Sequence, residues 1–178
     1  FCCTNDALVD IDAVAGSVTV GGQVQALAVG LDSDGATAEV FVDALNNVVL
    51  SGGITADAQS TDNPVLASIV VNSGGNLTVG PVSASASGGS TNSEQVALNP
   101  GGTLTTTGVL SGAQLSFGGL GGFNVVTSTP LVTILSGAGD AIIDNSAFTG
   151  AATLDFNGGG YTNMSFGFGG DVLVNAVS

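Results

Sequence analysis

The sequence contains no lysine, no arginine and no histidine, against 14 aspartate and glutamate residues. Without cationic side chains the chain cannot pair with phosphates, on which nucleic-acid affinity depends, and anionic membrane surfaces are excluded for the same reason. A serine nucleophile would lack an imidazole or amine as its general base, and phosphoryl transfer would lack a stabilising cation. The composition therefore predicts that the protein binds no nucleic acid and is not an enzyme.

Other absences narrow the field further. The chain has no tryptophan and one tyrosine, which leaves few aromatic platforms for sugar rings. Paired carboxylates can hydrolyse glycosides, so a secreted hydrolase that uses only carboxylates stays as a third alternative. No apolar run approaches the roughly 18 residues of a membrane-spanning helix, so no membrane span is expected.

The net charge of −14 opposes compaction, because no cationic side chain offsets it. High salt, a bound divalent metal or a neutralising partner is expected to compensate. Calcium suits carboxylate oxygens. Asp32 and Asp34 precede a glycine as in the opening of a calcium loop, but the closing glutamate is missing, and an ordinary turn is the alternative. Asp10 and Asp12 share one strand face and could add a second site or be solvated.

The composition predicts an all-β fold in one domain. Hydrophobic residues make up 44% and charged residues 8% of the 178 residues, and 29 glycines punctuate short β-branched segments. Residues 36–44 alternate between small or apolar and polar side chains, as in a strand with one buried face. We expect an antiparallel β-sandwich of the jelly-roll kind with an N-terminal extension.

A parallel β-solenoid is the alternative fold. Residues 72–78 and 99–105 share a Gly-Gly-x-Leu-Thr phrase at an offset of 27, which could be one coil of stacked repeats. The phrase resembles rungs of secreted bacterial β-helical proteins, although it covers a small part of the chain and transfers no residue role. The other double-glycine turns are unevenly spaced, which favours the sandwich.

The N-terminal segment suggests a role in assembly. We divide the chain into an arm, residues 1–14, and a single β domain, residues 15–178. Val9, Ile11 and Ala13 lie on one face of the arm, so the arm could add a strand to an open sheet of a neighbouring subunit.

Cys2 and Cys3 are the only cysteines and are adjacent. Ordinary disulfide geometry disfavours a bond between neighbours. Cross-links between subunits, a strained vicinal bond or free thiols, and lipid attachment all stay open. Zinc is not expected, because two cysteines without histidine do not complete a tetrahedral site.

Several features favour an extracellular or cell-surface location. The chain begins with Phe1 rather than methionine, which suggests removal of a secretory signal peptide, with a proteolytic fragment as the alternative. It offers no lysine or arginine to trypsin-like proteases. Asn76 and Asn163 head N-glycosylation sequons, so glycans are expected there if the sequons are used.

These features together predict a secreted structural subunit. Identical subunits would polymerise into an extracellular filament, pilus-like thread or sheath through N-terminal strand exchange, with Cys2 and Cys3 as inter-subunit cross-links. The main alternative is a calcium-dependent adhesin or surface-layer binding module.

Overall fold

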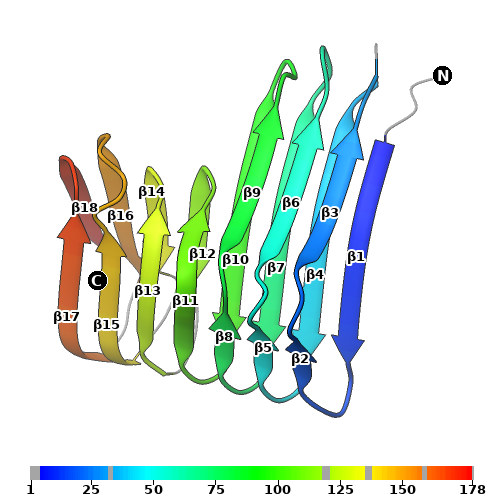
Figure 1. Cartoon of the computed structure of the whole chain (residues 1–178). Helices are drawn as coiled ribbons and strands as arrows, with labels where there is room; N and C mark the ends of the chain where they lie inside the picture. Colours follow the sequence, from blue (N-terminus) through cyan, green and yellow to red (C-terminus); the bar gives the residue numbers. More distant parts are fainter. Residues whose placement is uncertain (1–4, 32–33, 118–120, 135–137, 158–159, 178) are drawn as a thin grey trace.

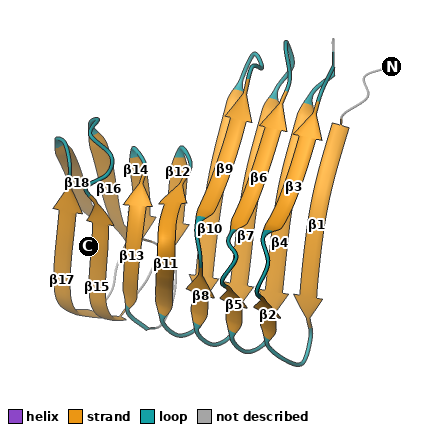
Figure 2. Ribbon diagram, viewed as in Figure 1, coloured by secondary structure: helices purple, strands orange, loops and turns teal. Residues whose placement is uncertain are grey.

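The computed structural model describes residues 5–31, 34–117, 121–134, 138–157 and 160–177. Every regular element within these ranges is a β-strand (Figure 2). Within the same ranges, no helix is long and apolar enough to cross a membrane.

Two sheets face each other, and the chain alternates between them. Every strand pair between neighbouring coils is parallel, and each pair of the first sheet keeps one register along its whole length. The first sheet has eight strands in the order β1 (Asn5–Ala13), β4 (Ala36–Ala44), β7 (Val65–Ser73), β10 (Asn92–Pro100), β12 (Gln114–Phe117), β14 (Leu131–Ile134), β16 (Ala152–Asn157) and β18 (Val172–Val177).

The second sheet is built from the remaining strands. Its continuous path runs through β2 (Val18–Val20), β5 (Val48–Leu50), β8 (Leu77–Val79), β11 (Leu104–Ser111), β13 (Phe123–Ser128), β15 (Ala138–Asn145) and β17 (Gly160–Phe168). Beside this path, β3 (Val24–Val29), β6 (Ile54–Gln59) and β9 (Val82–Ser87) pair with one another.

This arrangement is a parallel β-solenoid, so the predicted antiparallel sandwich is wrong and the alternative fold is right. The repeated phrase is one coil of the solenoid, because Asn72 pairs with Asn99 and Leu77 pairs with Leu104. The alternation of buried and exposed residues is the same in both folds, and therefore could not tell them apart. The turns are unevenly spaced because the coils differ in length.

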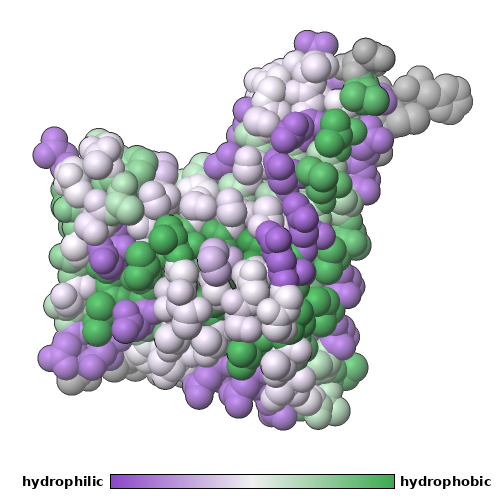
Figure 3. Space-filling model, in the orientation of Figure 1, coloured by the Kyte–Doolittle hydropathy of each residue, from purple (hydrophilic) through white to green (hydrophobic). Residues whose placement is uncertain are grey.

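Coil length changes abruptly in the middle of the chain. Successive coils, measured between paired residues, take 31, 29 and 27 residues as far as β10, and 17 to 22 residues afterwards. The long coils carry the additional strands β3, β6 and β9, which have no counterpart beyond β11. The molecule is consequently tall at its N-terminal end and low at its C-terminal end, with a step between the two parts (Figures 1 and 3).

The core consists of inward side chains stacked in columns along the solenoid. One column runs through Val9, Val40, Ile69, Val96, Leu115, Val132, Leu154 and Val174. Its six middle members are at most 1% exposed. In the additional strands the inward residues are mostly alanines, such as Ala56 and Ala84, whose small size lets the sheets approach closely.

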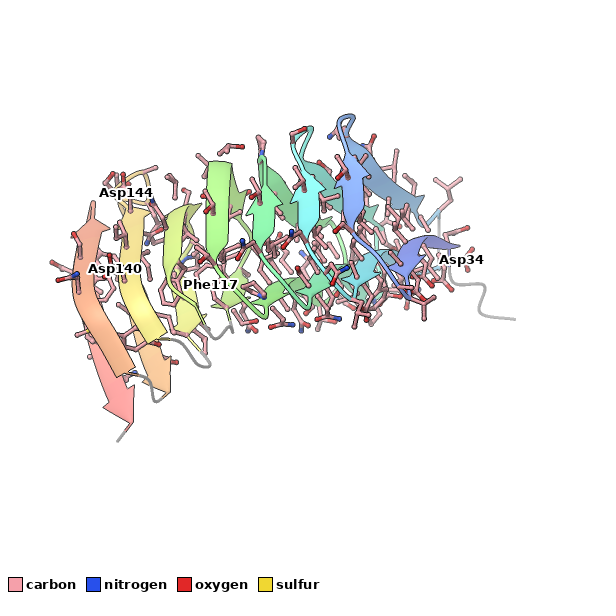
Figure 4. All side chains as sticks on the ribbon, turned by 90° about the horizontal axis from the view of Figure 1, so that it is seen from below. Asp34, Phe117, Asp140 and Asp144 are labelled. Atoms are coloured by element: carbon pink, nitrogen blue, oxygen red, sulfur yellow. The ribbon has the colours of Figure 1, made fainter. Side chains whose placement is uncertain are left out.

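The lower coils contain larger side chains. Phe117 lies between the sheets (Figure 4). Its ring centroid is 6.3 Å from that of Phe123, and the Tyr161 ring meets Phe123 edge-on at 5.9 Å.

Side-chain amides and small residues fix the turns between the sheets. Asn47 Oδ1 accepts the backbone N–H of Asn76 at 2.8 Å, and Asn76 Oδ1 accepts that of Thr103 at 2.9 Å. This asparagine ladder joins three successive coils at one corner and supplies partners for backbone groups that the strands leave unpaired. Gly53, at another corner, has φ of +89°. The Cβ of any other residue at this position would lie only 2.5 Å from the Pro81 carbonyl oxygen, so a larger residue does not fit there.

Candidate functional site

The two ends of the solenoid are its most distinctive surfaces. Thirteen large apolar side chains are exposed among the described residues, and nine of them lie on the first or last coil. Those of the first coil are Leu8, Val14, Leu27, Val29 and Leu31, and those of the last coil are Met164, Val172, Leu173 and Val174. Apolar surface collected in this way indicates an interaction site.

The last described coil leaves side chains of the core columns exposed. Val174 stacks on the fully buried Leu154 and is itself 51% exposed, while Met164 stacks on the fully buried Ala141 and is 59% exposed. Leu173, on the outer face of the same strand, is 60% exposed. The strand β18 carries no charge and has no partner beyond β16 among the described strands. Such an uncharged sheet edge readily accepts another strand.

At the N-terminal end β1 forms the corresponding edge. Residues 5–13 pair along their whole length with β4 of the same chain, and Val9, Ile11 and Ala13 are half-buried against the core. The outer face of β1 carries Asp6, Asp10 and Asp12. The predicted donor-strand face is therefore directed into its own solenoid, and the opposite edge of β1 is the one available to a neighbour.

The step between long and short coils is capped, in contrast to the two ends. The pairing register places Asn92 and Glu94 in the inward columns that hold Val65 and Ala67 one coil earlier. The Glu94 carboxylate turns toward β9 and accepts the backbone N–H of Ala86 at 3.0 Å. Polar residues therefore cover the core where the additional strands stop. In the first and last described coils, by contrast, apolar side chains are exposed to solvent.

An acidic face covers the first two strands of the eight-stranded sheet. Five carboxylates project there, from Asp6, Asp10, Asp12, Glu39 and Asp43. Asp12 and Asp43 are register partners, about 4.8 Å apart in the backbone. Asp10, Asp12 and Asp43 line an open hollow of about 280 Å³ beside Phe41 and Asn72.

Within the described ranges, no group of three or more aspartate, glutamate or cysteine side chains is placed to hold a metal ion. Asp32 lies outside the described residues. Asp34 begins the return to β4, and its carbonyl accepts the Ser60 hydroxyl at 2.5 Å. Asp34 lies toward the N-terminal end, far from Asp140 and Asp144 (Figure 4).

The remaining predicted sites fall in different places. Cys2 and Cys3 lie outside the described residues, so their cross-linking stays a prediction. Asn76 is exposed, and its Oδ1 accepts the backbone N–H of Thr103 in the asparagine ladder. A glycan would be attached to its Nδ2. Asn163 is exposed on β17, but its Nδ2 donates to Asp140 Oδ1 at 2.8 Å. Use of either sequon stays a prediction.

Two ionisable groups near the C-terminal end are perturbed. The side-chain hydroxyl and the backbone N–H of Ser146 lower the pKa of the Asp144 carboxyl. Partial burial among the aromatic rings raises the pKa of the Tyr161 hydroxyl. The cause in each case is local, a hydrogen bond to the charged form or desolvation of it.

The comparisons with known proteins add no relative. No protein-family model, no curated protein and no solved structure matches this chain.

Sequence reasoning predicted an assembly role for the arm that contains β1, and it did not single out β18 or Glu94. Two signals pointed to them. Residues 172–177 form an apolar segment without a charge, and Glu94 is the only acid between residues 63 and 139. An isolated charge within a neutral stretch is consistent with a specific structural position.

Proposed function

We propose that this chain is a secreted structural subunit that polymerises through the open ends of its solenoid into an extracellular filament or sheath. The contrast between the ends and the step supports this proposal. Glu94 and Asn92 close the core at the step, while Val174 and Met164 leave it open in the last described coil. A surface of this kind is stabilised when another copy covers it.

The mode of joining differs from the exchange expected from the sequence. Withdrawing β1 from its own solenoid would break its pairing with nine residues of β4 and uncover Val40 and Val42. Addition of a strand to the outer edge of a sheet leaves that pairing intact. We therefore propose edge addition as the mechanism, with Cys2 and Cys3 as covalent reinforcement next to β1.

A single charge at the open end tests the proposal. Leu173→Asp places a carboxylate on the exposed face of the last strand, and Val109→Asp makes a similar change on an exposed strand position of a middle coil, where Val109 is 42% exposed. Both variants should fold, as judged by circular dichroism. Sedimentation and negative-stain microscopy should show assembly for Val109→Asp and its loss for Leu173→Asp. Equal assembly of both variants would contradict the role of the ends.

A calcium-dependent adhesin or surface-layer module is the second candidate, and the five carboxylates on β1 and β4 favour it. In that case calcium should raise the unfolding temperature of the purified protein and a chelator should reverse the gain. Asp12→Asn together with Asp43→Asn should abolish the response. An unchanged unfolding temperature in millimolar calcium would remove this candidate.

A further inference from the structure

Both ends of the solenoid present the same core columns, which gives any joint between copies a defined register. The column that begins with Val9 ends with Val174, because each coil places one residue on the next without a shift along it. A neighbouring copy that continued this column would place its Val9 on Val174. Its Leu8 would then lie beside Leu173, and both leucines are 60% exposed.

Ends can meet in three ways, and charge opposes one of them. A joint between two N-terminal ends would bring two copies of β1 together, each with three aspartates and no cationic side chain to neutralise them. A joint between two C-terminal ends is not opposed by any charged side chain of β18, but it closes a dimer and leaves the acidic ends outside. A joint between unlike ends places the uncharged β18 against the acidic β1.

Hydrogen bonding favours the joint between unlike ends. Asn175 Nδ2 donates to Asp155 Oδ1 at 2.7 Å. An amide and a carboxylate therefore already pair across neighbouring coils among the outward side chains next to Val174 and Leu154. In the continued register Asn175 lies beside Asp10 of the next copy. The second amide hydrogen of Asn175 can then be donated to that carboxylate, which continues the pattern without a cation.

We propose that successive copies join with one polarity, β18 of one copy pairing in parallel with β1 of the next, so that Leu173 lies beside Leu8 and Asn175 beside Asp10. This inference rests on the proposed function and specifies its geometry. A joint between two different surfaces does not close on itself unless its rotation forms a ring, and it therefore produces an open polymer.

The two sheets do not contribute equally to the joint. The first sheet has eight strands and the continuous path of the second has seven, ending at β17. Pairing of β18 with β1 therefore leaves the second sheet one strand short at each joint. Each copy would incline toward that side, and the axial repeat would lie between seven and eight strand spacings, about 34–38 Å.

Cysteine capture tests polarity and register in the full chain. Leu8→Cys and Leu173→Cys are made separately, each with Cys2→Ser and Cys3→Ser, and are mixed in high salt under mild oxidation. Neighbouring parallel strands place the two Cα atoms within the 4.4–6.8 Å that a disulfide needs. The mixture should give covalent dimers at least tenfold above either variant alone. The control replaces Leu173→Cys by Val109→Cys, an exposed position on a middle coil outside the joint, which should give no capture.

Each result decides between the possibilities. Dimers from Leu173→Cys alone would show a joint of like ends and overturn the proposal. Filaments without capture in the mixture would also overturn it while leaving the proposed function in place. Loss of all assembly in the wild-type chain at high salt would overturn both.

Discussion

The Glu94 cap offers a direct test of how the solenoid ends its core. Glu94→Ala removes the acceptor of the Ala86 N–H, and Ala86 is 7% exposed, so water has little access to the vacated amide. Glu94→Gln removes the same negative charge but keeps a side-chain oxygen at the same place. The difference between these two variants therefore isolates the hydrogen bond from the relief of charge repulsion.

The magnitude follows from the burial of the amide. A buried donor left without a partner costs about 1–3 kcal/mol, so we expect Glu94→Ala to be about 2 kcal/mol less stable than Glu94→Gln. With an m-value of about 2 kcal/mol/M, the urea midpoint should differ by about 1 M between the variants. Circular dichroism measures the midpoint, and hydrogen exchange reports on the Ala86 amide itself.

Two results would refute this reasoning. Glu94→Ala and Glu94→Gln would have the same midpoint if the carboxylate did not bond to the Ala86 amide. Unchanged protection of the Ala86 amide in Glu94→Ala would lead to the same conclusion. Either result would remove the contrast between a capped step and uncapped ends.

Two further predictions concern the lower coils. Asn145 is fully buried and makes three hydrogen bonds. Its Oδ1 accepts the Thr127 hydroxyl at 2.9 Å and the Thr129 N–H at 3.1 Å, and its Nδ2 donates to the Thr129 carbonyl at 3.1 Å. Asn145→Ala should therefore lower the free energy of unfolding by about 4 kcal/mol. Asn163→Ala, on an exposed strand, serves as its control in urea unfolding and should cost less than about 1 kcal/mol; equal losses would contradict the buried network. The pKa of Tyr161 is raised on folding, so its contribution to stability is complete below its unfolded pKa and is lost as the pH rises through the folded value. Stability measured above about pH 10 should therefore fall more in the wild type than in Tyr161→Phe, and parallel curves would refute this assignment.

Strand positions were readable from the sequence, whereas strand partners were not. The alternation in residues 36–44 correctly marks β4 and its buried face. Alternation reports only which side chains face the core, and it is the same for a partner from the next coil or from an adjacent hairpin. The single strong echo at residues 72–78 and 99–105 was the signal of coiling. It did not recur because the coils shorten after β10.

The assembly surfaces were only partly predictable for the same reason. The apolar face of Val9 and Ile11 was visible, but which strand covers it depends on a pairing distant in the sequence. The exposure of Val174 depends on its place in the last coil, since the same kind of residue is fully buried at Val132. Only the order of the coils reveals which of the described strands lie at the edges of the sheet.

Cryo-electron microscopy of the polymer at high salt tests the central claim most directly. Screening weakens the mutual repulsion of the acids, so filaments should form more readily as the salt concentration rises. Joints of one polarity predict a strand spacing of about 4.8 Å and an axial repeat of about 34–38 Å, marked by alternation of the tall and low parts of each copy. A repeat of about 77 Å, as expected when like ends meet, or dispersed monomers at every salt concentration would contradict it.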